Sequence, residues 1–212
     1  MRDPLGPDLT DGARPLVDAL VIAGGAARRF GSDKTSAVVG GVAILERVVR
    51  AARPLVSSTT VIGPWAPAGC ERIIEPQPRE GPLVALAFGL GRVAGEYVLV
   101  LGGDHPFLVS DLLAMIVGRS VALGDRADAV VPVRDGRPEP LVACYRTAPV
   151  ARIAARLVAG GERRLGALVE GLEVVALDEE MWRRVDPSGM SFRDIDTPED
   201  LARAQGDADR YS

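Results

Sequence analysis

Residues 20–35 read Leu20-Val-Ile-Ala-Gly-Gly-Ala-Ala-Arg-Arg-Phe-Gly-Ser-Asp-Lys-Thr35 and carry the pattern that decides the fold of this 212-residue chain. A compact apolar run stops at Gly24-Gly25, and a loop rich in glycine and arginine follows, ending in Lys34. Backbone that approaches a phosphate chain favours residues without a Cβ, and the anion favours surrounding N–H groups and cations. A strand with such a loop at its carboxyl end is typical of nucleotide sites in α/β folds. A tight turn alone would also explain Gly24-Gly25.

The spacing of this loop differs from those of the two common phosphate loops. Five residues separate Gly25 from Gly31, and two more precede Lys34. A P-loop requires four residues between its glycines and a lysine directly after the second, and a dinucleotide loop requires G-x-G-x-x-G. The spacing therefore excludes a P-loop NTPase. It also argues against a nicotinamide-dependent oxidoreductase, which would in addition need an acidic residue that the chain lacks at the expected position.

Outward from this loop, strand-like apolar runs alternate with segments of helical period. Strands are predicted at residues 17–23, 57–63, 72–75, 97–102, 127–133, 141–146, 174–177 and 192–195. Helices are predicted at residues 42–52, 83–93, 150–158 and 164–170, with one more capped by Ser110 and a last one opened by Thr197-Pro-Glu-Asp200. The alternation predicts a single-domain α/β fold, a mostly parallel Rossmann-like three-layer sandwich. We place a flexible tail at residues 1–15, the domain at 16–205 and a second tail at 206–212.

Composition narrows the class of protein. The chain is 47% hydrophobic and 25% charged, with a net charge of −4 and no basic stretch suited to a nucleic-acid backbone. Its first residues lack the basic and apolar regions of a signal peptide, and no apolar run approaches the roughly 20 residues of a membrane span. Cys70 and Cys144 are predicted to be reduced thiols, with Cys144 buried. We expect a soluble cytoplasmic protein with no nucleic-acid or membrane partner.

A second strand end carries a candidate metal ligand. Tyr97 to Leu101 is an apolar run typical of a central parallel strand, and it ends in Gly102-Gly103-Asp104. A carboxylate at such a tip suits Mg²⁺, which takes one or two carboxylates plus phosphate oxygens. A helix cap or a turn would equally explain Asp104 alone. Both glycine-rich ends are expected on one edge of one sheet.

These residues resemble the MobA family of molybdenum cofactor guanylyltransferases. The likeness rests first on Ala23-Gly-Gly-Ala-Ala-Arg-Arg-Phe-Gly-Ser-Asp-Lys34, and covers about residues 17–205. Further matching motifs are Gly81-Pro-Leu83, Gly103-Asp104-His-Pro106, Glu139-Pro-Leu-Val-Ala-Cys-Tyr145, Gly161-Glu-Arg-Arg164 and Asp194-Ile-Asp-Thr-Pro-Glu-Asp200. The resemblance implies a fold like that of the nucleotide-diphospho-sugar transferases. It implies transfer of GMP from GTP to molybdenum-bound (or adenylated) molybdopterin, which gives the guanine dinucleotide cofactor and pyrophosphate. Molybdoenzymes or cofactor-insertion proteins would be partners.

The resemblance also assigns roles to particular residues. Lys34, Arg29 and Asp104 would be catalytic, with Arg29 facing the β and γ phosphates and Lys34 the α-phosphate. The nucleotide would contact Ala23, Gly24, Gly25, Ala26, Arg29, Gly31, Lys34, Glu75, Gly81, Pro82, Leu83 and Asp104. Mg²⁺ would be held by Asp104 with Asp196. Arg163, Arg164 and Asp194 would lie on the pterin side.

Several of these assignments have plain structural alternatives. Glu75 could be a surface carboxylate, and Asp196 could simply belong to the start of the last helix. Arg163 and Arg164 could form a solvated helix start. His105, where an apolar residue is common, is interpreted as a partly exposed turn histidine, although contact with the metal site is an alternative.

Other functions also remain open at this stage. One is a related transferase that uses CTP, or that acts on a sugar phosphate or phospholactate. The cytidylyl family favours Ala-Ala-Gly in its loop and lacks Gly-Pro-Leu, unlike this chain. Another is a nucleotide-binding cofactor-assembly protein that has lost turnover, against which intact Lys34 and Asp104 argue.

Overall fold

The computed structural model describes residues 16–24, 34–76 and 80–208. Its strands are β1 (Val17–Ile22), β2 (Val38–Val39), β3 (Val42–Ala43), β4 (Ser58–Ile62), β5 (Glu71–Ile73), β6 (Tyr97–Gly102), β7 (Ala129–Arg134), β8 (Arg137–Pro138), β9 (Val142–Arg146) and β10 (Val174–Leu177). Its α-helices are α1 (Ile44–Ala52), α2 (Pro82–Leu90), α3 (Ser110–Leu123), α4 (Thr147–Ala159), α5 (Leu165–Glu170), α6 (Glu179–Trp182) and α7 (Pro198–Ala208). Short 3-10 turns are η1 (Lys34–Ser36), η2 (Arg53–Leu55), η3 (Gly124–Arg126) and η4 (Met190–Phe192).

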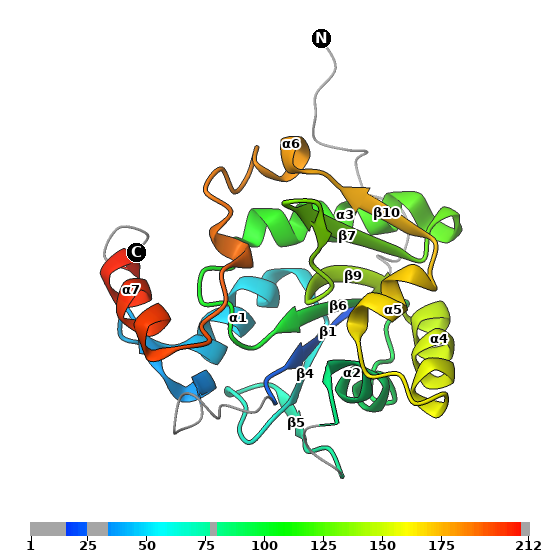
Figure 1. Cartoon of the computed structure of the whole chain (residues 1–212), viewed down its shortest axis with the longest axis horizontal. Helices are drawn as coiled ribbons and strands as arrows, with labels where there is room; N and C mark the ends of the chain where they lie inside the picture. Colours follow the sequence, from blue (N-terminus) through cyan, green and yellow to red (C-terminus); the bar gives the residue numbers. More distant parts are fainter. Residues whose placement is uncertain (1–15, 25–33, 77–79, 209–212) are drawn as a thin grey trace.

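One mostly parallel sheet organises the molecule (Figure 1). Its strand order is β10-β7-β9-β6-β1-β4-β5, with β8 paired to β7. The exceptions to the parallel arrangement are β9, antiparallel to both β6 and β7, and β8. The central strands β1 and β6 are buried along their whole length. Such continuous apolar runs suit strands covered on both faces, as the sequence predicted.

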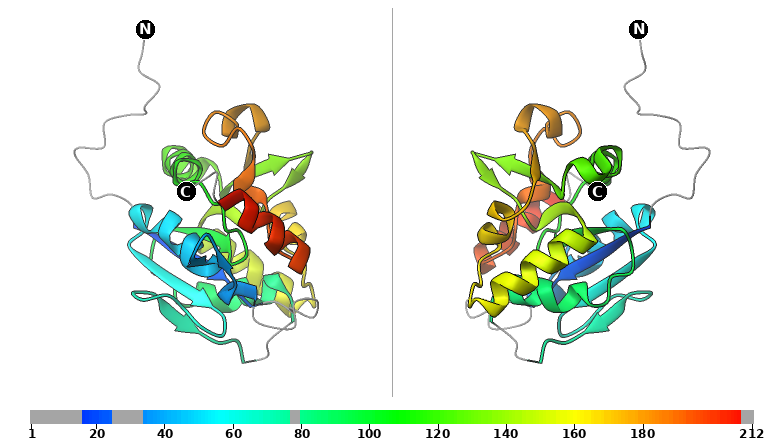
Figure 2. Two further views of the ribbon diagram at one scale, coloured as in Figure 1. Left: turned by 90° about the vertical axis from the view of Figure 1, so that its left-hand side faces the viewer. Right: turned by 90° about the vertical axis from the view of Figure 1, so that its right-hand side faces the viewer.

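Helices cover both faces of the sheet and form three layers. Val17, Ala19 and Val21 of β1 pack into a core with α1 and α3. Leu20 and Ile22, which point to the opposite face, pack with α2, α4 and α5. In Figure 2, α7 faces the viewer in the left panel and α4 faces the viewer in the right panel, so the two helices lie on opposite sides of the molecule. The predicted three-layer α/β fold is confirmed.

At the amino-terminal edge of the sheet, Asp18 is a buried polar exception in β1. Its carboxylate accepts hydrogen bonds from Ser58 Oγ at 2.8 Å and from the backbone N–H groups of Ala94 and Gly95 at 3.0 and 2.8 Å. Three donors on one carboxylate satisfy its buried oxygens. Asp18 thereby fixes the turn that leads into β6.

Two predicted features at helix and strand ends are wrong. Ser110 is the first residue of α3 and not its cap, because Val109 takes that position and no side chain caps the helix. The predicted strand at residues 192–195 is instead the end of η4 followed by irregular backbone. By contrast, Thr197 caps α7 as predicted, since its Oγ1 accepts from Asp200 N at 3.1 Å. Helix α7 extends to Ala208, three residues beyond the predicted domain end at 205.

The remaining expectations concern thiols and membrane spans. Within the part of the chain that the structure describes, both cysteines are free, and Cys144 is fully buried as predicted. Burial raises the pKa of the Cys144 thiol to about 12. No described helix has both the length and the apolar character needed to cross a bilayer.

Candidate active site

The register of the sheet aligns the carboxyl ends of four strands along one edge. Ile22 of β1 pairs with Gly102 of β6 and Ile62 of β4, and Ile62 pairs with Ile73 of β5. The residues that follow these strand ends are therefore neighbours in space. They include Ala23, Gly24, Glu75, Gly103 and Asp104. In open α/β sheets this edge is where ligands bind.

Two glycines allow the tips of β1 and β6 to approach closely. A Cβ on Gly103 would lie 2.8 Å from the Cβ of Ala23, a separation that side chains do not tolerate. A Cβ on Gly102 would lie 2.6 Å from the ring of His105 and 2.8 Å from Oδ1 of Asp104. Gly103 thus lets the tip of β6 approach Ala23, and Gly102 leaves the space that the Asp104 carboxylate and the His105 ring occupy.

His105 is buried against Asp104. Only 6% of the histidine is exposed, and its Nδ1 lies 3.0 Å from Oδ1 of Asp104. Although burial disfavours the charged ring, the carboxylate of Asp104, with Asp194 and Glu139 further off, raises the pKa of His105 above its usual value. The interpretation of a partly exposed turn histidine is wrong. The ring is packed into the acidic edge of the sheet.

A backbone hydrogen bond brings two further carboxylates to Asp104. Ile195 N donates to Asp104 O at 3.0 Å, so Asp194 and Asp196 flank the point of contact. Burial first, and then the charges of Asp196 and Asp104, raise the pKa of Asp194. Among the described residues, no three side chains of the His, Cys, Asp and Glu types converge into a protein-only metal site. A magnesium ion on a phosphate needs only one or two carboxylates, and this set provides them.

Glu75 is buried next to Gly24. Its exposure is 9%, and its Oε1 has no hydrogen-bond partner among the described residues. A Cβ on Gly24 would lie 3.6 Å from Oε2 of Glu75, so the carboxylate faces the first glycine of the loop. Burial, with a smaller contribution from Glu80, raises the pKa of Glu75. The alternative of a surface carboxylate is therefore wrong, although its contact with a nucleotide stays a prediction.

Lys34 begins η1 next to the same edge. The adjacent Thr35 is buried, and its Oγ1 accepts a hydrogen bond of 3.1 Å from Nε1 of Trp65, which lies in the loop after β4. This contact places the η1 backbone beside the carboxyl end of β4. The side chain of Lys34 lies outside the described part of the structure, as do Gly25, Ala26, Arg29 and Gly31.

The start of α2 meets the segment before α5. Gly81 has a φ of 117°, and a Cβ there would lie 3.1 Å from Arg163 O. Leu83 N donates to the same carbonyl at 3.4 Å, and the Arg163 guanidinium lies 3.7 Å from Glu80. The described contacts of Arg163 thus tie it to the predicted nucleotide-binding element Gly81–Leu83. They do not join it to Asp194, with which the sequence grouped it.

Arg164 forms an ion pair with the neighbouring Glu162. Its guanidinium lies 2.9 Å from Glu162, whose Oε1 also accepts from the backbone N–H groups of Arg163 and Arg164. These hydrogen bonds lower the pKa of Glu162 to about 2. The alternative of a solvated helix start describes Arg164 well.

Glu139 is a residue of this edge to which sequence reasoning gave no role. It is held by Arg134, whose Nε lies 2.9 Å from Oε1 of Glu139. Burial outweighs this pairing and raises the pKa of Glu139. The signal was present in the Glu139-Pro-Leu motif. The sequence alone could not reveal this role, because Glu139 reaches this edge only when β9 runs antiparallel to β6.

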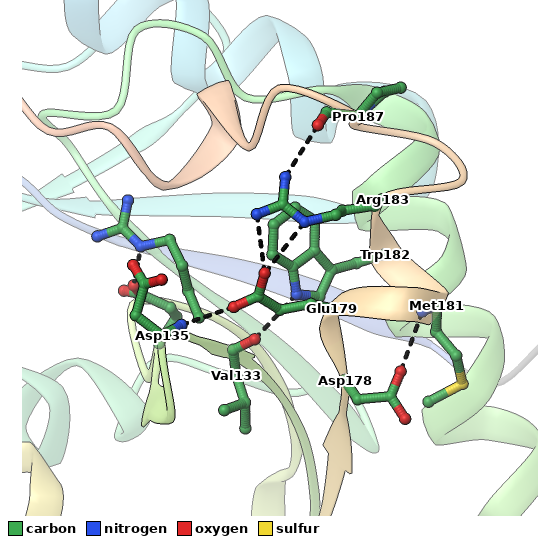
Figure 3. Close-up of polar contacts among 10 residues, drawn as sticks. Val133, Asp135, Asp178, Glu179, Met181, Trp182, Arg183 and Pro187 are labelled. Atoms are coloured by element: carbon green, nitrogen blue, oxygen red, sulfur yellow. Dashed lines mark hydrogen bonds and ion pairs between the residues drawn. The ribbon is translucent and has the colours of Figure 1, made fainter.

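A polar network supports the end of β7 (Figure 3), the strand whose Arg134 pairs with Glu139. Glu179 accepts from Asp135 N at 2.7 Å and from Arg183, while Trp182 Nε1 donates to Val133 O at 2.9 Å. Arg183 stacks over the Trp182 ring at 4.6 Å and donates to Pro187 O. Helix α6 is thereby fixed to the β7–β8 hairpin, which carries Arg134.

The fold and this edge define the class of protein: an α/β protein with a glycine-rich sequence after its first central strand and carboxylates at the tips of the central strands. A sequence model described as "MobA-like NTP transferase domain" matches residues 19–175. The chain belongs to this family of nucleotidyltransferases.

Similar proteins span almost the whole chain. A probable molybdenum cofactor guanylyltransferase of Chloroflexus aggregans is 32% identical, over 90% of this chain and 94% of the relative. The crystal structure of molybdopterin-guanine dinucleotide biosynthesis protein A from Archaeoglobus fulgidus has a TM-score of 0.77 and 26% identity, covering 91% of this chain and 99% of that one. A 2-C-methyl-D-erythritol 4-phosphate cytidylyltransferase from Thermus thermophilus shares the fold, with a TM-score of 0.68 and 21% identity, covering 92% of this chain and 99% of that one.

Proposed function

We propose that this chain transfers GMP from GTP to molybdopterin and releases pyrophosphate, forming a guanine dinucleotide cofactor. The observation that carries the proposal is the alignment of the loop after β1, buried Glu75 and the Asp104 cluster on one sheet edge. The names of the similar guanylyltransferases support the choice of base and acceptor.

In the proposed reaction, a phosphate oxygen of molybdopterin attacks the α-phosphorus of GTP. A new P–O bond forms, the bond to the β-phosphate oxygen breaks, and pyrophosphate leaves with the electron pair. The attacking phosphate is already anionic at neutral pH, so no general base is needed. The protein therefore acts by positioning two anions and by stabilising charge on the leaving group.

The resemblance to MobA-like transferases supports the following roles for the residues. Ala23 and Gly24 lead into the loop whose N–H groups would cradle the triphosphate, and Arg29 would face its β and γ phosphates. Lys34 would neutralise the α-phosphate. Gly81–Leu83 and Glu75 would contact the nucleoside part, as the resemblance implies, and Glu75 faces Gly24 at the start of the loop. Asp194 would face the acceptor.

Asp104, with Asp196, would hold Mg²⁺. The charges of Asp196 and Asp104 both raise the pKa of Asp194, and carboxylates gathered in this way suit a divalent cation. When bound, the ion would supply charge neutralisation for phosphate oxygens. The His105 ring against Asp104 would fix the orientation of this carboxylate.

Composition adds support for Lys34. It is the only lysine among the 25 lysine and arginine residues of the chain. A chain that uses arginine at every other basic position keeps a compact ammonium group here. An ammonium is a point charge with three donors, whereas a guanidinium is a broad planar fork.

The test is pyrophosphate release with each NTP and Mg²⁺, with and without molybdopterin. We expect turnover with GTP that depends on the pterin. Lys34→Ala and Asp104→Asn should each reduce turnover at least about 10²-fold, by loss of transition-state charge stabilisation. The matched control is Asp111→Asn, an exposed carboxylate in the first turn of α3, which should leave turnover unchanged.

Turnover with CTP, or with a sugar phosphate in place of molybdopterin, would overturn the proposal in favour of a related transferase. Nucleotide binding without turnover under any condition would favour a cofactor-assembly protein. A cytoplasmic location and contacts with molybdoenzymes or cofactor-insertion proteins remain predictions of the same proposal.

A further inference from the structure

Three segments far apart in the sequence carry the proposed catalytic groups. Lys34 begins η1, which leads into the β2–β3 hairpin. Asp104 lies in the loop after β6, and Asp194 with Asp196 precedes α7. In-line transfer requires these groups to be placed relative to one another within a fraction of an ångström, because small misplacements cost large factors in rate. Something must therefore join the three segments.

An apolar cluster, separate from the two cores of the sheet, packs against all three segments. Its buried members include Val39 of the hairpin, Phe107 of the loop after β6, and Ile195, which separates Asp194 from Asp196. Ile44 of α1 with Ala204 and Ala208 of α7 complete this set, which we call the junction cluster. Each catalytic segment thus inserts one apolar side chain into the same small core.

Arg47 binds two of the three segments directly. Its Nε donates to Pro106 O at 2.8 Å, two residues after Asp104, and its Nη1 donates to Val39 O at 3.2 Å. The guanidinium also lies over the ring of Phe107, with its Cζ 5.6 Å from the ring centroid. One side chain of α1 therefore joins the hairpin after Lys34 to the loop that carries Asp104.

We propose that Arg47 is a positioning residue that sets the Lys34 segment and the Asp104 loop in register for nucleotidyl transfer. Its described contacts are with two backbone carbonyls and the Phe107 ring, and it acts through these. The catalytic part of this inference rests on the proposed function, whereas the mechanical coupling of the two segments does not.

Arginine suits this task better than lysine. A planar guanidinium can donate in two fixed directions while its face packs on an aromatic ring. A lysine ammonium could reach one carbonyl but could not hold both and cover Phe107. Loss of the side chain would also leave two partly buried carbonyls without these donors, which favours local opening.

The test compares Arg47→Met, which keeps the apolar stem, with Arg50→Met. Arg50 lies three residues further along α1, is 61% exposed and pairs only with Glu46 among its described contacts. With GTP and molybdopterin, we expect Arg47→Met to lower kcat at least tenfold and to change KM for GTP by less than about threefold. Arg47→Lys should recover part of kcat, and Arg50→Met should match the wild type.

A second measurement needs no substrate. Hydrogen exchange of the free protein should show the amides of residues 38–43 and 105–109 losing protection together in Arg47→Met, while those of Leu99 to Leu101 in β6 stay protected. Normal exchange in both segments, or a normal kcat, would overturn the inference. A wild type that fails to turn over GTP while the paired exchange effect persists would instead refute the proposed function and leave the coupling intact.

Discussion

At the scale of single residues, Glu75 shows a conflict between stability and function. Folding buries this carboxylate without a hydrogen-bond partner for its Oε1 among the described residues. Such a group costs stability and is retained where a ligand will satisfy it. The proposed nucleotide supplies that ligand.

We therefore expect Glu75→Gln to be more stable than the wild type at pH 7.5, by about 1 kcal/mol, and to bind GTP more weakly. The raised pKa of Glu75 means that the folded state binds more protons than the unfolded state between the two pKa values. Stability of the wild type then falls as pH rises through this window. The advantage of the variant should vanish below the unfolded pKa of about 4.3.

Thermal unfolding at pH 7.5 and at pH 4, together with GTP titration, checks this expectation. The control is Glu96→Gln, an exposed carboxylate before β6 that should change neither quantity. A variant less stable than the wild type at pH 7.5 would show that Glu75 has a stabilising partner in the free protein.

At the scale of elements, α2 depends on a small residue for its contact with the sheet. A Cβ on Gly89 would lie 2.6 Å from Cδ1 of Ile62 and 2.7 Å from Cδ1 of Leu20. Gly118 of α3 is also helical, but a Cβ there would have no described atom within 4 Å. A glycine-to-alanine substitution therefore tests packing against the sheet in α2 and helix propensity in α3.

Gly118→Ala should raise the free energy of unfolding by up to about 1 kcal/mol through helix propensity. Gly89→Ala should lower it, because an overpacking cost of about 1–3 kcal/mol exceeds the same propensity gain. Denaturant unfolding of both variants measures the difference. Stabilisation by Gly89→Ala would mean that Ile62 and Leu20 move aside without cost.

The elements also show which parts of the fold could be predicted from sequence. The apolar runs of β6 and β10 were placed at their observed bounds, because period and composition are local properties. The prediction of a strand at residues 192–195 is wrong. This segment is held to Asp104 by the backbone hydrogen bond from Ile195, a tertiary contact that a local sequence pattern does not reveal. Likewise, Val42 and Ala43 belong to a hairpin although they continue the helical period of α1.

In the candidate site, too, some residues could be predicted from local sequence and others could not. The position of Asp104 beside the end of β1 could be predicted because both strand ends follow apolar runs directly in sequence, whereas the loop from Gly25 to Asp33 lies outside the described residues. The burial of His105 could not be predicted, since it depends on the space left by Gly102. Arg47 and Glu139 were missed because their contacts join residues from distant parts of the chain, and no local pattern marks them.

At the scale of the whole molecule, α7 packs beside the sheet edge that carries the candidate site. Ala204 and Ala208 are fully buried in the junction cluster, to which Leu201 also packs. Gln205 donates to Val38 O at 3.4 Å, so the last helix reaches the hairpin that follows Lys34. Figure 1 shows α7 on the side toward which β1 and β6 point.

Ala204→Glu should therefore destabilise the protein by roughly 2–5 kcal/mol, because it places an unpaired charge in an apolar contact. Ala202→Glu, on the exposed face of the same helix, should change the free energy of unfolding by less than about 0.5 kcal/mol. Equal effects of the two substitutions in denaturant unfolding would show that α7 is not held by its buried alanines.

Asp18, at the edge of the sheet opposite the site, has a consequence for recombination between relatives. The proposed nucleotide contacts from Ala23 to Leu83 precede the turn at Ala94-Gly95, and the acidic edge from Asp104 onward follows it. A crossover at this turn would exchange the segment with the proposed nucleoside contacts and the segment with the acidic edge separately. Because the Asp18 carboxylate accepts from both N–H groups of the turn, viable chimaeras are those whose first module brings an acceptor at that position.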